Sequence, residues 1–190
     1  MMAQSVNQNF LESTIKLFRY YKSLGDKTFA QLSEQDINWR PNEVSNSIGL
    51  IVQHLKGNML SRWTDFLSTD GEKPWRDREA EFNIDFESKK DMIEGWEAGW
   101  KCLLETLEHL DEADLARIIY IRNEEQTVLE AINRQLAHYA SHVGQIMVMG
   151  KMLKGSQWSS LSIAKGGSNA LNAEKFSQEK SRKHFTEGLK

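Results

Sequence analysis

Proline is nearly absent from this sequence, and its placement limits the folds available to the chain. The two prolines, Pro41 and Pro74, fall between long segments in which apolar residues recur every three or four positions. Because a proline inside a helix removes a hydrogen bond and clashes with the preceding turn, uninterrupted segments of this kind favour helix. The pattern therefore predicts an all-α protein.

Helix boundaries are expected from the periodicity and from capping residues. A serine or asparagine within residues 45–47 can cap the second helix, and Ser88 resembles the start of the third. Thr127 and Glu130 form a capping box that opens the fourth helix. The predicted helices span residues 9–32, 47–67, 88–110 and 127–155.

The connections between these helices are long. Residues 68–83 are rich in charge and turn formers, and they are expected to form an ordered loop because Trp75 and Phe82 favour burial. Residues 118–121, with the sequence IIYI, are expected to form an extended connection. Long connections are compatible with helix crossovers, because short loops enforce a plain antiparallel arrangement.

Length and charge restrict the class of protein. The 190 residues suit one domain, which we assign to residues 1–165, with a tail over 166–190 that holds a possible short helix. A formal net charge of −3 argues against a nucleic-acid partner, because proteins that bind nucleic acid usually carry an excess of positive charge. Neither a membrane span nor a secretory leader is visible, so a cytoplasmic location is expected.

Two histidines lie four residues apart in the fourth predicted helix, in the segment HYASH. At roughly 100° per residue, His138 and His142 are separated by about 40° around the helix and by one turn, so their imidazoles can share one ion. Ala131, Gln135 and Met149 lie beside the pair, and the main apolar stripe is centred about 120° away. Ordinary helix surfaces also contain such pairs, so spacing alone leaves metal binding and a simple helix-face role open.

The second predicted helix carries a polar row beside its apolar stripe. The row contains His54, Asn58, Ser61 and Asp65. Polar side chains beside an apolar stripe are what a solvent-accessible pocket between helices requires, and a solvated helix face is the alternative. Asp65 lies three turns from His54 and is too distant to share a ligand site with it. Asn58 and, on the fourth helix, Gln135 lie near the expected site and are candidates for orienting a bound water, but neither amide accepts a proton usefully at neutral pH. A general base therefore stays unassigned.

Other reactive side chains favour structural roles. Cys102, the single cysteine, excludes an internal disulfide and is expected to be a buried, inert thiol. Arg62 lies near the centre of an apolar stripe, so it is expected to pair with an acidic residue or to bind a carbonyl oxygen. His109 suits the C-terminal end of the third helix, where it interacts with the helix dipole. His184 is expected to be exposed in the charged tail.

Four segments in a fixed order connect this sequence with a known family. They are INWRP, SNSIGLIVQHLKGNMLSRWTDFL, DGEKPWR and TVLEAINRQLAHYASHVGQI. Together they span most of residues 10–165, and the sequence resembles the DinB/YfiT-like superfamily of bacterial metalloenzyme-like proteins, in a subgroup of uncharacterised function.

The resemblance implies a four-helix bundle with up-down-down-up connectivity and a metal-binding triad. One triad histidine lies on the second helix and two lie on the fourth, which match His54, His138 and His142. Three neutral imidazoles suit zinc, with nickel or iron as further candidates, and they leave a coordination position open.

Characterised relatives in the superfamily include thiol S-transferases that use low-molecular-weight thiols such as bacillithiol, and a mycothiol-dependent isomerase. The resemblance therefore implies a metal-dependent thiol S-transferase or hydrolase acting on a small-molecule substrate. The alternative is a non-catalytic, metal-stabilised bundle with a stress-response or interaction role. A homodimer is also expected, with Trp96 and Trp100 available for an interface, although both tryptophans suit the core equally well.

Overall fold

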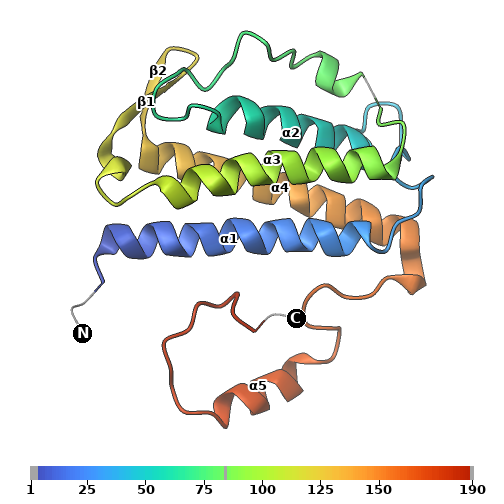
Figure 1. Ribbon diagram of the computed structural model, residues 1–190. Helices are drawn as coiled ribbons and strands as arrows, with labels where there is room; N and C mark the ends of the chain where they lie inside the picture. The colour runs from blue at the N-terminus through green and yellow to red at the C-terminus, as the bar shows by residue number, and fades with distance from the viewer. Residues whose placement is uncertain (1–3, 84, 189–190) are drawn as a thin grey trace.

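The computed structural model describes residues 4–83 and 85–188 and is mostly helical. Four long helices lie side by side, and a shorter helix lies apart from them in the C-terminal tail (Figure 1). An all-α fold with one short hairpin agrees with the sequence pattern. The helices are α1 (Val6–Phe29), α2 (Ile48–Trp63), α3 (Lys89–His109), α4 (Val128–Lys154) and α5 (Ser168–Phe176).

The segment that follows α1 forms hydrogen bonds with one end of each of the other three long helices. Backbone and side-chain oxygens of residues 32–37 accept hydrogen bonds from Gly49 N, Lys89 Nζ and Lys154 Nζ. These donors lie at the start of α2, the start of α3 and the end of α4. The chain therefore enters α2 and α3 at the end of the molecule where α1 finishes (Figure 1).

The predicted helix starts are confirmed where a side chain provides the cap. Ser47 and Ser88 accept hydrogen bonds from backbone N–H groups three residues further on, and Thr127 and Glu130 form the expected capping box. The predicted ends of the first two helices are too late, because α1 ends at Phe29 and α2 at Trp63. After α2 the backbone turns at Asp65, which has a φ of 50°.

The predicted extended connection is one strand of a hairpin. Strand β1 (Ile118–Ile121) pairs antiparallel with β2 (Glu124–Thr127) through a turn at Arg122 and Asn123, both with positive φ. The second strand escaped prediction because three of its four residues, in the sequence EEQT, are Glu or Gln, and its one β-branched residue, Thr127, is assigned to the helix cap. Asp70 of the long loop accepts hydrogen bonds from both turn N–H groups, which ties that loop to the hairpin.

Aromatic side chains from all four long helices meet in the core. The Phe18 ring lies 6.0–6.5 Å, centroid to centroid, from the rings of Trp63, Trp100 and Tyr139. Trp96 and Trp100 are 1% and 0% exposed, so they serve the core and cannot form an interface between copies. Cys102 is half-buried beside Thr64, and burial raises the pKa of its thiol, in keeping with an unreactive side chain.

The C-terminal tail returns along α1. His184 contacts the Ser13 hydroxyl at 3.1 Å, and Glu187 pairs with Lys16. The expectation that His184 is exposed is therefore wrong, since α1 covers part of its ring. No residue of α5 is buried, so this helix contributes nothing to the core.

Replacing Gly25 by alanine is expected to destabilise the protein. The new Cβ would lie 2.4 Å from Cζ2 of Trp96, whose indole N–H is held by a 2.7 Å hydrogen bond to Asp26 Oδ1. Overpacking costs about 1–3 kcal/mol, and two ring atoms of Trp96 within 2.7 Å of the new Cβ place this site in the upper part of that range. The cost therefore exceeds the gain of about 1 kcal/mol in helix propensity. Urea unfolding measures the difference, and Gly144→Ala is the control because its added Cβ meets nothing within 4 Å. An unchanged free energy of unfolding for Gly25→Ala would contradict this tight contact.

Candidate metal centre

Three histidine side chains converge between α2 and α4. The Nε2 atom of His138 lies 3.4 Å from Nε2 of His54 and 3.1 Å from Nε2 of His142. One ligand nitrogen from each ring lies within 4.8 Å of the other two. The helical spacing of four residues brings the α4 pair together, and the packing of α2 against α4 adds His54. The three histidines named by the resemblance therefore form one cluster.

The donor geometry fits a divalent ion. Two nitrogens at about 2.0–2.1 Å from a tetrahedral zinc lie about 3.3 Å apart, close to the two separations measured from Nε2 of His138. The Nδ1 atom of His54 lies 2.9 Å from Glu81 Oε2, so this nitrogen carries the proton and Nε2 presents a lone pair to the cluster. Nδ1 of His138 faces Gln135 Oε1 at 3.4 Å, which favours the same tautomer. Facing lone pairs repel one another, and a cation between them removes that repulsion.

Burial keeps the α4 histidines in the form that binds metals. Desolvation, together with the neighbouring histidines, lowers the pKa of His138 to about 3. Desolvation also lowers the pKa of His142, while the nearby Gln145 partly offsets this effect. The Nδ1 atom of His142 is buried and has no hydrogen-bond partner. Both imidazoles are therefore neutral near pH 7, as metal coordination requires.

A buried carboxylate from the long loop orients His54. While Oε2 of Glu81 faces the His54 ring, Arg76 donates from Nε to Oε1 at 2.7 Å and from Nη2 to Oε2 at 3.0 Å. Burial raises the pKa of Glu81, but the hydrogen bonds from His54 and Arg76 outweigh it and hold that pKa below its ordinary value. The Phe82 ring stacks on His54 at 5.0 Å. This carboxylate–histidine arrangement is typical of metal ligands whose tautomer is set by a second residue.

The ion pairs continue away from the cluster. Arg76 lies 3.6 Å from Glu72, whose other carboxylate oxygen accepts from Arg62 at 3.1 Å. Arg62 also donates to the carbonyl oxygen of Gly71. The expectation that Arg62 pairs with an acidic residue or binds a carbonyl is confirmed in both forms. Trp75 is 58% exposed, so the prediction that its burial orders this loop is wrong, and the ion pairs supply the order instead.

The polar row of α2 is covered, contrary to the expectation of a solvent-accessible flank. His54, Asn58 and Ser61 are 5%, 6% and 0% exposed, because the loop after α2 packs over them. Ser61, for example, donates to the carbonyl oxygen of Gly71 and accepts from the N–H of Lys73. The partly exposed α4 histidines therefore form the reachable side of the cluster.

The buried face of α4 is also displaced from its predicted position. Ala131, Gln135 and Met149, which the sequence placed beside the histidine pair, are buried, whereas Leu129 and Leu136 of the predicted apolar stripe are only half-buried. The shift arises because α4 packs against both α1 and α2, which widens its covered face toward the histidines.

Asn58 and Gln135, the two candidates for orienting a bound water, differ in whether another side chain already engages them. Asn58 accepts a 2.9 Å hydrogen bond from the Tyr139 hydroxyl, which itself accepts from Trp63 Nε1 at 3.1 Å. Burial raises the pKa of Tyr139, so the hydroxyl stays protonated and donates to the Asn58 oxygen. Asn58 is thus committed to the core, whereas Gln135 faces His138. Asp65 lies outside the cluster, as expected.

Sequence reasoning missed Arg76 and Glu81. Arg76 belongs to the segment DGEKPWR, which carried the family resemblance without receiving a role. Glu81 lies in a charged stretch where nothing local distinguishes it from Glu79. A charged, turn-rich segment of this length next to a candidate ligand helix is the signal that could have directed attention to both residues.

These features define a mostly helical protein with a three-histidine cluster that could hold a metal ion. A family model matches residues 5–167, and the chain belongs to this family, described as a protein of unknown function, DUF1572. A comparison with the curated proteins finds no significant match. Among the described residues, no helix combines the length and apolar character needed to cross a membrane.

Removal of one histidine is expected to abolish tight metal binding. Tag-free wild-type protein should bind about one equivalent of zinc, and His138→Ala should weaken the zinc affinity by at least about 100-fold. Loss of a residue that only hydrogen-bonds to a ligand weakens metal affinity by about 10- to 100-fold, and loss of the ligand itself should weaken it more. Competition with a chromophoric chelator measures both affinities. His109→Ala, at the exposed end of α3, is the control. Equal zinc affinity in wild type and His138→Ala would exclude the cluster as the metal site.

Displacing Glu81 is expected to weaken the site indirectly. Glu81→Gln should lower zinc affinity about 10- to 100-fold, because the amide no longer provides a charged acceptor for His54. Gly57→Ala should act in the same direction, since its Cβ would lie 2.0 Å from Glu81 Oε1. Gly144→Ala is again the matched control. If both variants lose stability but keep wild-type zinc affinity, Glu81 supports only the loop.

Proposed function

We propose that this protein is a divalent-metal-dependent enzyme of the thiol S-transferase type. The observation that carries the proposal is the convergence of three imidazole nitrogens in a partly exposed cluster, with the outer nitrogen of His54 held by a buried carboxylate. Three protein ligands leave a coordination position for a substrate, whereas closed structural zinc sites use four. Zinc is the preferred ion, with nickel or iron as alternatives.

When bound, the ion supplies Lewis-acid chemistry that lowers the pKa of a thiol or a water in the open position. His54, His138 and His142 would hold it, Glu81 would orient His54, and Gln135 would face the outer nitrogen of His138. The α4 side of the cluster gives a substrate access, because only His138 and His142 are partly exposed.

The surroundings of the cluster favour thiol chemistry over hydrolysis. Both oxygens of Glu81 are engaged by His54 and Arg76, and the Asn58 oxygen is engaged by Tyr139. Neither side chain is free to take a proton from water. A thiol, with an ordinary pKa of about 8.5, needs much less assistance to ionise near pH 7 than water, with a pKa of about 15.7.

The proposed reaction joins a low-molecular-weight thiol to an electrophilic small molecule. The thiol releases its proton to solvent, its sulfur forms a bond to the electrophilic carbon, and the leaving group departs with the electron pair of the broken bond. A low-molecular-weight thiol is therefore the expected cosubstrate, and the reaction needs no further oxidant or reductant.

The proposal extends to the fold and its superfamily. We infer an up-down-down-up bundle of the DinB/YfiT-like type, which forms a domain over residues 1–165. Supporting this are the starts of α2 and α3 beside the end of α1 and the family match, which includes all four long helices.

Metal-loaded wild-type protein is expected to accelerate the displacement of a leaving group by a thiol on small electrophiles by at least about tenfold, equivalent to about 1.4 kcal/mol of barrier. Bacillithiol, cysteine and coenzyme A should each be tested with an electrophile panel, with His138→Ala to remove the site and His109→Ala as the control. Equal rates for wild type and His138→Ala would remove the transferase proposal. Ester hydrolysis without thiol would identify a hydrolase, and zinc-dependent stabilisation without any turnover would identify a non-catalytic bundle.

A further inference from the structure

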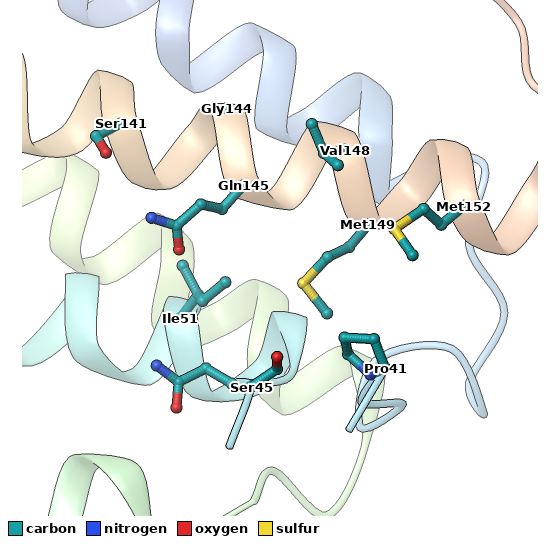
Figure 2. Close-up of a pocket in the computed structure, with 10 residues that line it drawn as sticks. Pro41, Ser45, Ile51, Ser141, Gly144, Gln145, Val148, Met149 and Met152 are labelled. Carbon is teal, nitrogen blue, oxygen red and sulfur yellow. The ribbon is translucent and has the colours of Figure 1, made fainter. Parts of the chain in front are cut away.

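A groove of about 650 Å³ lies between the start of α2 and the C-terminal half of α4 (Figure 2). Its volume falls within the range of small-molecule sites, about 300–1,000 Å³. The apolar part of its lining comes from Pro41, Ile51, Val148, Met149 and Met152.

The groove adjoins the histidine cluster. Gln145, which lines the groove, lies near His142, and Ser141 precedes that histidine in the chain. On the opposite wall, Ile51 lies one helical turn before His54. Figure 2 shows the Gln145 amide extending from α4 toward Ile51. A molecule lying in the groove would therefore have one end beside the reachable side of the cluster.

The chemistry of the lining selects an uncharged occupant. None of the residues that line the groove carries a charge, and its polar groups are the neutral side chains of Ser45, Asn46, Ser141 and Gln145. Anionic ligands are normally held by arginine, lysine or helix N-terminal N–H groups. At the start of α2, the N–H groups of Gly49 and Leu50 already donate to Ile37 and Ser47. Cellular thiols carry carboxylates or phosphates, so this groove does not suit them.

Two of the apolar side chains remain largely exposed. Val148 is 56% exposed and Met152 is 58% exposed, so an apolar ligand would remove costly surface from water. Methionine side chains adapt to ligands of different shape because they are unbranched and polarizable. Met149 and Met152 therefore suit a site that accepts a range of apolar molecules.

We propose that this groove binds an uncharged, apolar small molecule, which is the electrophilic substrate of the reaction proposed above. The inference rests on that proposed function for the role of the ligand. The thiol approaches the cluster from outside the groove, while the apolar substrate lies along α4 with its reacting carbon toward His142.

The neutral fluorescent probe N-phenyl-1-naphthylamine tests the groove directly. The metal-loaded full chain should bind it, and Val148→Asp should weaken its affinity at least tenfold by placing a charge among apolar side chains. Val6→Asp is the matched control, since Val6 is 84% exposed at the start of α1. Gly144→Leu provides a charge-neutral block, because Gly144 lines the groove and has open space around its added Cβ.

Zinc affinity should stay unchanged in all three variants, which separates this test from that of the metal centre. Equal probe affinity in wild type, Val148→Asp and Gly144→Leu would overturn the proposal. So would equally tight binding of the anionic probe 8-anilinonaphthalene-1-sulfonate, which contradicts selection for an uncharged ligand. If Val148→Asp instead converts a dimer to a monomer without weakening probe binding, the groove is an interface between two copies. Loss of probe binding in Val148→Asp and Gly144→Leu, but not in Val6→Asp, supports the groove as a binding site for apolar molecules even if no thiol transfer is detected.

Discussion

The hydrogen bond between Glu81 and His54 is the interaction on which the site depends. It joins residues 27 positions apart and brings the loop after α2 over the face of that helix. A buried carboxylate is costly unless its charge is compensated, and Arg76 compensates it with two further hydrogen bonds. The pairs formed by Arg76 and Arg62 with Glu72 then stabilise the rest of the loop. One charged network thus covers α2 and sets the tautomer of His54.

Buried hydrogen bonds between α2 and α4 link the core to the histidine cluster. Tyr139 follows His138 in the chain, and its hydroxyl links Trp63 and Asn58 of α2. Because these polar groups are buried, breaking their hydrogen bonds would leave unsatisfied donors in the core. The separation of α2 and α4, and therefore the distance between the histidines, is held by this buried chain as well as by apolar packing.

The surroundings of the cluster differ sharply between its two sides. On the loop side, arginines and glutamates form a closed set of ion pairs around His54. On the α4 side, the groove is apolar and uncharged. Such asymmetry suits a site in which one side orients a ligand residue and the other admits an apolar molecule.

Local sequence determined the helices and part of the site. The capping box of Thr127 and Glu130 and the pairing of His138 with His142 follow from geometry within one or two helical turns, so both could be predicted directly. Tertiary structure decided the rest, because it depends on segments that are distant in the chain. His54 meets His138 across 84 positions, and nothing local distinguishes Glu81 from its acidic neighbours. Burial of the α2 polar row likewise required the loop to pack over it, since a helical pattern shows which residues share a face but not what covers that face.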